Sequence, residues 1–262
     1  MTALKASRRK AFVAYIVSGD PRPDVTLPTM HALVEEGVDV IELGVPFSDP
    51  MAEGQVIQLG HERALTHNFS LTNTLELVRS FRLSNTTTPV VLMGYANPIE
   101  RMGYDRFAYR AAEAGVDGVL TVDLPPEESE AFSKVLRTLG LENIFLLAPT
   151  TTPSRIRHII SMAGGFIYYV SLKGVTGAGN LDTESVRQKI MEIRQLTDLP
   201  LCVGFGIKDG QSAKSVAQYA DGAVVGSIFV DKMGASLKAD DLTIVNGVRK
   251  LARDIRSGLD QC

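Results

Sequence analysis

The sequence predicts an α/β protein, a single-domain (β/α)8 TIM barrel with extra short helices that spans residues 1–262. Short apolar runs alternate with longer amphipathic runs along the whole chain, a pattern typical of strand–helix units that build a parallel sheet. The apolar runs number eight, and the chain has the usual length of an eight-stranded barrel. With 45% hydrophobic and 22% charged residues, a chain of this length can bury a sizeable core.

The eight apolar runs give the expected strands. In chain order they are residues 11–17, 38–43, 90–93, 118–122, 144–148, 166–171, 201–203 and 222–226. No linker rich in Pro, Gly or Ser divides the chain, which favours one domain. The main alternative is an open doubly wound sheet, but the glycine-rich dinucleotide fingerprint of that fold is missing after the first run.

The runs between the strands carry helix signals. Residues 126–140 begin with Pro and acidic side chains and end at Gly, which predicts one helix. In the next helical run, Thr152 can cap the helix and Pro153 can open it. These signals support the strand–helix alternation.

Charge and composition exclude several classes of partner. A net charge of −3 and a pI near 5.9 give no basic field for nucleic acid. The apolar run near the N-terminus is too short to span a membrane and has no convincing cleavage site, which predicts a cytoplasmic protein. Cys202 and Cys262 do not have the spacing of a metal site, and we expect no metal.

Glycines at the ends of the last three strands suggest a phosphate site. Gly177 follows the sixth expected strand and Gly206 the seventh, while Gly226 and Ser227 follow the eighth. A barrel builds its active site at these ends, and glycines let backbone N–H groups approach an anion closely. Any one of these glycines could equally serve only a tight turn. Their presence at three consecutive strand ends favours a phosphate cradle.

Acidic residues cluster at the end of the second expected strand. Glu42 lies between apolar neighbours in a strand that should be buried, so its carboxyl group has either a bonding partner or a raised pKa. A raised pKa suits proton transfer, whereas hydrogen bonds to nearby backbone N–H groups would make the acid structural. Asp49 is more typical of a turn. Glu53, taken alone, is typical of a solvated loop.

Several motifs in the chain together resemble one known family. They are "ELGVPFSDPMAEG", "YANPIERMG", "VDLPPEES", "YYVSLKGVTGA", "GFGI" and "GAVVGS". From about residue 12 to residue 230, in this order, the chain resembles the α subunit of tryptophan synthase. The resemblance implies a lyase that cleaves indole-3-glycerol phosphate into indole and glyceraldehyde 3-phosphate. It also implies a β subunit as partner in an α2β2 heterotetramer, with pyridoxal phosphate only in the β subunit and no cofactor in this chain.

The resemblance assigns roles to individual residues. Glu42 is expected to protonate indole C3 and then to accept the hydroxyl proton, while Glu53 accepts or stabilises the indole N–H. The β subunit is expected to contact Phe47, Asp49 and the segment from Asn97 to Gly103, which includes Pro98. The expected indole pocket consists of Tyr15, Met93, Leu120, Val122, Leu146, Tyr168, Thr176, Phe205 and Val224. For each apolar member taken alone, the sequence favours a place in the barrel core over a place in the pocket.

The loop after the second strand departs from the family pattern. The family most often reads "ADGP" where this chain has Glu53 and Gln55 in place of Asp and Pro. A displacement of about 1 Å can cost on the order of a hundredfold in rate at a rigid site. Two alternatives therefore stay open. One is a related barrel enzyme, such as an isomerase, that acts on another phosphorylated substrate. The other is a weakened subunit that mainly binds and activates the β subunit.

Overall fold

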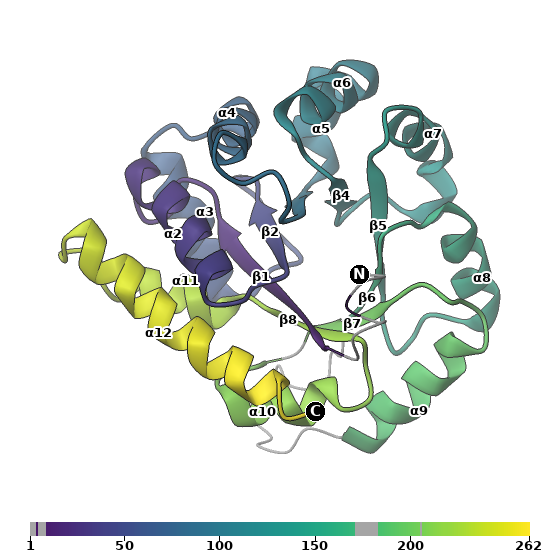
Figure 1. The fold of residues 1–262 in the computed structure, drawn as a ribbon. Helices are drawn as coiled ribbons and strands as arrows, with labels where there is room; N and C mark the ends of the chain where they lie inside the picture. Colours follow the sequence, from purple (N-terminus) through teal and green to yellow (C-terminus); the bar gives the residue numbers. More distant parts are fainter. Residues whose placement is uncertain (1–3, 5–8, 171–182, 205) are drawn as a thin grey trace.

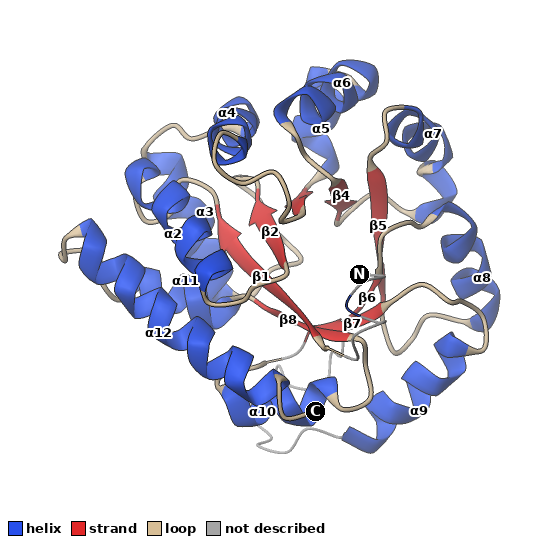
Figure 2. Cartoon of the chain, viewed as in Figure 1, coloured by secondary structure: helices blue, strands red, loops and turns tan. Residues whose placement is uncertain are grey.

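The predicted barrel is confirmed. The computed structural model describes residues 4, 9–170, 183–204 and 206–262. Eight parallel strands close into a barrel in chain order, with β8 hydrogen-bonded to β1, and helices surround it (Figure 1, Figure 2). The strands are β1 (Ala11–Val17), β2 (Val40–Gly44), β3 (Val90–Gly94), β4 (Gly118–Thr121), β5 (Glu142–Leu147), β6 (Ile167–Val170), β7 (Leu201–Gly204) and β8 (Gly222–Val225).

The helices follow the strands along the chain. They are α2 (Pro23–Glu35), α3 (Gln55–Thr66), α4 (Leu71–Arg82), α5 (Ala96–Met102), α6 (Tyr104–Ala114), η1 (Pro126–Glu128), α7 (Glu130–Thr138), α8 (Pro153–Met162), α9 (Thr183–Arg194), α10 (Gly210–Ala217), α11 (Ser227–Gly234) and α12 (Asp241–Leu259). In the described ranges, no helix is both long enough and apolar enough to cross a lipid bilayer.

One helix prediction is wrong in detail. The run 126–140 forms a short 3-10 helix, η1, and a separate helix, α7, instead of one helix. The hydroxyl of Ser129 donates to the carbonyl oxygen of Pro125 at 2.8 Å, and such side-chain bonds compete with helix geometry. The predicted start of α8 is confirmed, since the Thr152 side chain accepts from the Arg155 N–H and Pro153 occupies the first turn.

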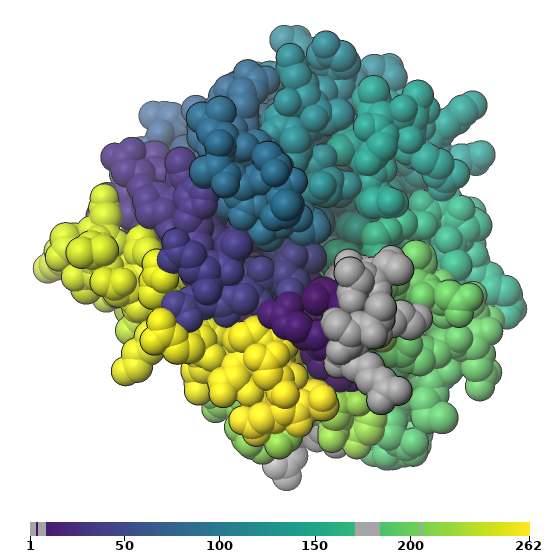
Figure 3. All heavy atoms as spheres, viewed as in Figure 1, coloured from purple at the N-terminus to yellow at the C-terminus, as the bar shows by residue number. Residues whose placement is uncertain are grey.

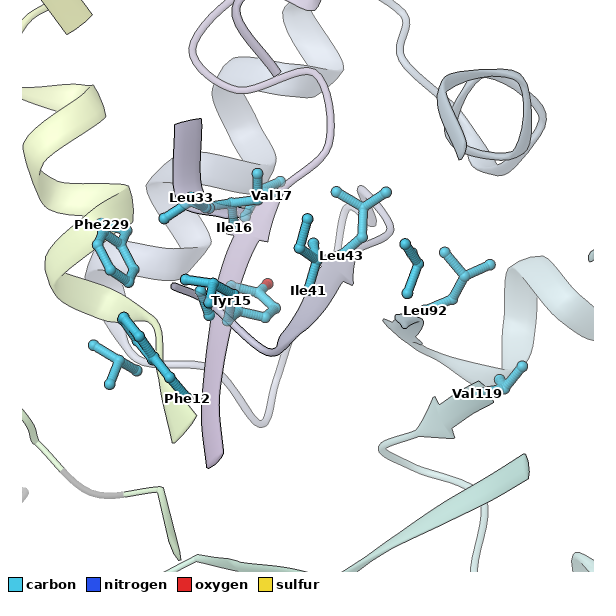
Figure 4. Close-up of a cluster of buried hydrophobic side chains, with 14 of the residues drawn as sticks. Phe12, Tyr15, Ile16, Val17, Leu33, Ile41, Leu43, Leu92, Val119 and Phe229 are labelled. Atoms are coloured by element: carbon cyan, nitrogen blue, oxygen red, sulfur yellow. The ribbon is translucent and has the colours of Figure 1, made fainter. Parts of the chain in front are cut away.

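Apolar side chains fill two layers, one inside the barrel and one between the strands and the helices. Val13 and Val40 belong to the inner layer. Ile41 and Leu43 belong to the outer layer, where Figure 4 shows them beside other strand side chains. Because successive side chains of a strand point to opposite faces, Glu42 is directed to the barrel interior.

The last helix of the chain packs against the first helical unit on the barrel surface. Helix α12 packs against α2, and the yellow C-terminal part lies beside the purple N-terminal part in Figure 3. Arg249 pairs with both Glu35 and Glu36, and Arg253 pairs with Glu36. These ion pairs connect the last helix to the first unit of the barrel.

A stability prediction follows from the crossing of α10 and α12. A Cβ on Gly258 would lie 2.0 Å from the carbonyl oxygen of Gly210, a backbone atom that cannot move aside alone. Gly258→Ala is therefore expected to lower the free energy of unfolding by about 1–3 kcal/mol, the usual cost of overpacking. Urea unfolding at equilibrium measures this effect.

Gly247→Ala in the same helix is the matched control. A Cβ there would meet only the end of the Lys232 side chain, which can move. Since Ala favours a helix by about 1 kcal/mol over Gly, this variant should be as stable as the wild type or more stable. Equal unfolding midpoints for the two variants would contradict the close helix crossing.

Candidate active site

A pocket of about 460 Å³ opens at the carboxyl ends of the strands. Nine of the residues expected at the site line it: Tyr15, Glu42, Glu53, Met93, Tyr168, Gly206, Val224, Gly226 and Ser227. They come from six strands or the segments that follow them, and from the loop before α3. The barrel thus brings the two acids, the apolar wall and the glycines to one place.

Other expected site residues lie elsewhere. Leu120, Val122 and Leu146 pack inside the barrel and are not among the described residues that line the pocket. Thr176, Gly177 and Phe205 lie outside the described residues.

Some lining residues did not stand out in the sequence: Val56, Ile57, Val170, Gly204 and Ile207. Gly204 is the first glycine of the "GFG" motif, of which only the second was singled out. The first turn of α3 supplies two of the others, and sequence pattern alone does not say that this turn faces the barrel mouth. Only their position in the sequence, next to residues that were predicted to line the site, could have indicated these residues.

Glu42 is a buried acid. Its side chain is 0% exposed, and neither carboxyl oxygen has a hydrogen-bond partner among the residues that the structure describes. Burial, and secondly the nearby Glu53, raises its pKa to about 8. The alternative of a structural carboxylate bonded to backbone N–H groups therefore does not hold. Glu42 is protonated at neutral pH and can act as an acid.

Glu53 lies in the loop between β2 and α3 and is half-buried. The loop backbone is fixed on both sides of the residue. Glu53 N–H donates to the carbonyl oxygen of Pro50 at 3.0 Å, and its own carbonyl oxygen accepts from Gln58 Nε2 at 2.9 Å. The N–H of Ala52 donates to Tyr95 Oη at 3.2 Å. Burial raises the pKa of the Glu53 carboxyl group to about 7.

Two tyrosine rings lie above glycines at the pocket. A Cβ on Gly44 would lie 2.4 Å from Tyr15 Oη, and one on Gly204 would lie 2.3 Å from Tyr168 Oη. Any larger residue at either glycine would displace a ring. Burial raises the pKa of both tyrosines well above the ordinary value, so both hydroxyls stay protonated. The rings form polar-tipped aromatic walls near Glu42.

The N-terminus of α11 faces the same pocket. Gly226 is its N-cap, Ser227 is its first residue, and both line the pocket together with Gly206. Gly206 has φ +41°, a left-handed conformation that glycine adopts readily. Because the first N–H groups of a helix lack helical partners and the helix dipole is positive there, this end can bind a phosphate group.

Three of the four individually named residues expected to contact a partner line a second groove. Phe47, Asn97 and Pro98 line this groove of about 560 Å³. The Phe47 ring stacks on Tyr95, with ring centroids 5.1 Å apart. Asp49 is exposed nearby and accepts a hydrogen bond from the hydroxyl of Ser48. The remaining walls include the basic side chains of Arg101, Arg106 and Arg110.

A closed parallel barrel with two carboxyl groups of raised pKa, aromatic walls and a helix N-terminus at its mouth is the arrangement of a (β/α)8-barrel acid–base enzyme. The chain belongs to the tryptophan synthase alpha chain family, whose model matches residues 1–257.

Known proteins of this family are similar over nearly their whole length. The alpha chain of Thiobacillus denitrificans is 54% identical over 259 residues, which are 99% of this chain and 94% of that protein. The alpha chain of Methylococcus capsulatus is 55% identical over 89% of this chain and 87% of that protein. The crystal structure of tryptophan synthase subunit alpha from Legionella pneumophila has a TM-score of 0.92 and 44% identity, and covers 100% of this chain and 97% of that one. A chain of the tryptophan synthase complex from Pyrococcus furiosus has a TM-score of 0.84 and 33% identity, over 94% of this chain and 98% of that one.

Proposed function

We propose that this chain cleaves indole-3-glycerol phosphate to indole and glyceraldehyde 3-phosphate, with Glu42 and Glu53 as its two acid–base groups. The observation that carries the proposal is that both carboxyl groups line one pocket and have raised pKa values, Glu42 about 8 and Glu53 about 7. Membership of the family makes the chain a carbon–carbon lyase of tryptophan biosynthesis.

The reaction needs one proton donor and one base at the departing carbon, and Glu42 can serve as both. The protonated Glu42 gives its proton to indole C3, which leaves a positive charge on the ring nitrogen. The Glu42 carboxylate then accepts the proton of the side-chain hydroxyl. A carbonyl group forms as the bond to C3 breaks, and the bonding electron pair returns to the ring to give indole.

Glu53 has a different task, because it faces the charge that develops on the ring. As a carboxylate it stabilises the indole N–H while C3 carries the added proton. The tyrosine rings and Met93 provide apolar surface for indole, and the N-terminus of α11 binds the phosphate group. This acid–base chemistry requires no organic cofactor in the chain.

The two pKa values predict a bell-shaped pH dependence of kcat/KM. Glu53 must be ionised, so activity should fall below about pH 7, where its carboxylate takes up a proton. Glu42 must carry a proton, so activity should fall above about pH 8, where it loses that proton. We expect a narrow maximum between these limits, measured as indole release across pH with the substrate well below KM. A profile that stays level from pH 6 to pH 9 would contradict the assignment of both groups.

Indole release tests the proposed function directly. The purified chain is incubated with indole-3-glycerol phosphate, alone and with a tryptophan synthase β subunit. Release by the chain alone that increases with the β subunit supports the proposed lyase. No release in either assay would favour a barrel enzyme with another phosphorylated substrate. No release by the chain, combined with activation of the β reaction, would favour a subunit that mainly binds and activates.

A β subunit is the proposed partner, in a heterotetramer of two α and two β subunits that works in the cytoplasm. The solved relative from Pyrococcus furiosus is described as a tryptophan synthase complex. In this chain, the groove lined by Phe47, Asn97 and Pro98 offers such a partner a partly exposed surface of apolar and basic side chains. Pyridoxal phosphate would belong to the β subunit, and indole would pass to it.

A further inference from the structure

A buried histidine that the proposed mechanism does not use lies next to the active site. His61 is on α3 and is 2% exposed. Its ring connects two parts of the barrel mouth. The N–H of Phe47, in the loop after β2, donates to His61 Nδ1 at 3.1 Å, and His61 Nε2 lies 3.3 Å from Tyr15 Oη.

These contacts determine the protonation of the histidine ring. A backbone N–H can only donate, so Nδ1 has no hydrogen and the ring is neutral, with its hydrogen on Nε2. Burial lowers the pKa of His61 to about 4, which agrees with a neutral ring. Nε2 is therefore the donor to Tyr15, and Tyr15 Oη is the acceptor.

The hydroxyl hydrogen of Tyr15 is consequently left for another acceptor. Among the described residues, the contact with His61 is the one hydrogen bond of Tyr15 Oη. Tyr15 lies opposite Glu42 in the β1–β2 register, and both side chains line the pocket. The two oxygens of Glu42 are buried and have no hydrogen-bond partner within the described ranges. In the described part of the chain, the Tyr15 hydroxyl therefore has no acceptor, the Glu42 carboxyl group has no donor, and both groups face one cavity.

We propose that His61 is a positioning residue, which holds Tyr15 so that its hydroxyl donates a hydrogen bond to the carboxylate that Glu42 becomes during the reaction. This inference rests on the proposed function. Burying a carboxylate without a hydrogen-bond donor costs free energy. Glu42 becomes a carboxylate only after it has given its proton to the substrate. The hydrogen bond therefore strengthens as the reaction proceeds, and its loss should lower kcat more than it changes KM.

The hydrogen bonds of His61 also connect the pocket to the loop that contains Phe47. The Phe47 ring lines the second groove, while its backbone N–H fixes the histidine.

A double-mutant cycle tests the inference. Tyr15→Phe removes the hydroxyl and keeps the ring, and His61→Leu removes both ring nitrogens. Each variant is expected to lower kcat for indole release by about tenfold, the size of one lost hydrogen bond to a charged group, with KM within about twofold of the wild type. If His61 acts through Tyr15, the double variant should lose about tenfold as well, whereas independent roles would multiply to about a hundredfold.

His67→Leu is the matched control, because His67 follows the same helix, its ring Nε2 lies 3.2 Å from the carbonyl oxygen of Pro21, and it is not among the described residues that line the pocket. It should keep wild-type kcat. Additive losses in the double variant, a change confined to KM, or wild-type activity of Tyr15→Phe would overturn the inference. Indole release by the wild type establishes the proposed function separately from all of these outcomes.

A measurement on the unaltered protein does not depend on the folding of any variant. Long-range proton–nitrogen correlation spectra of the wild type report which ring nitrogen of His61 carries the hydrogen. We expect hydrogen on Nε2 and a bare Nδ1 at pH 7.5. A hydrogen on Nδ1, or on both nitrogens, would overturn the inference.

Discussion

Glu42→Gln is expected to lower the rate of indole release by ~10²-fold to 10⁴-fold, the loss typical when a general acid–base group is removed. Glutamine has nearly the same size and shape but neither donates a proton to carbon nor accepts one. Affinity for a non-reacting glycerol phosphate analogue should stay close to that of the wild type, because the phosphate site lies at Gly226 and Ser227, on a different strand end. Steady-state kinetics and equilibrium binding measure the two quantities.

Glu142→Gln is the control for this variant. Glu142 begins β5 at the opposite end of the barrel, where it is exposed. The same chemical change there should leave indole release unaffected. Activity of Glu42→Gln above a tenth of the wild-type rate would show that Glu42 is not the proton donor.

The fold of Glu42→Gln can be checked by its stability. Glu42 has a pKa of about 8 in the folded chain, against 4.5 without the fold. The folded state thus binds more protons than the unfolded state between these pH values, and the stability of the wild type declines as pH rises through this range. Glutamine does not titrate, so the variant should escape this decline and be at least as stable as the wild type at pH 9.

Glu53→Gln should lower turnover by about 10²-fold, since the ring nitrogen loses the carboxylate that stabilises its charge. Binding of the glycerol phosphate analogue should change little. Glu53→Asp is the informative companion, because it shortens the side chain by one methylene and restores the acid most common in the family. It should retain measurable activity, as determined by the same indole assay.

Glu62→Gln, in an exposed position of α3, is the control for changes in this region. Its rate of indole release should equal that of the wild type. If Glu53→Gln turns over at a rate near that of the wild type, the second acid is misassigned. Asp49 is the other acid in this loop, but it is exposed and does not line the pocket.

The sequence predicted the barrel well because its signals are local. Alternation of apolar side chains locates the strands, and every expected strand end within the described ranges lies within two residues of the observed one. The cap at Thr152 is also a local bond between neighbouring residues. The division of the run 126–140 was missed, since the composition of the run does not show that the hydroxyl of Ser129 bonds to the carbonyl oxygen of Pro125, between η1 and α7.

The acids show where sequence reasoning stopped. Motif and strand position indicated Glu42 and Glu53, but their pKa values come from burial, which is produced by elements far apart in the chain. Likewise, Met93 reaches the pocket while Leu120 packs inside the barrel, although both are apolar residues of inner strand positions. The depth of each residue along the barrel axis decides between these places, and that depth follows from the stagger of the closed sheet.

The sequence by itself determined the fold, the family and the chemical type of the two acid–base groups. Strand period, turn residues and motifs depend only on which residues follow one another in the chain. Tertiary structure alone decided that Glu42 has no hydrogen-bond partner among the described residues, that Glu53 joins it from a loop, and that His61 is neutral and bonded to Tyr15. These are properties of contacts between β1, β2 and α3. They depend on distances and solvent exclusion, which arise only when the barrel closes.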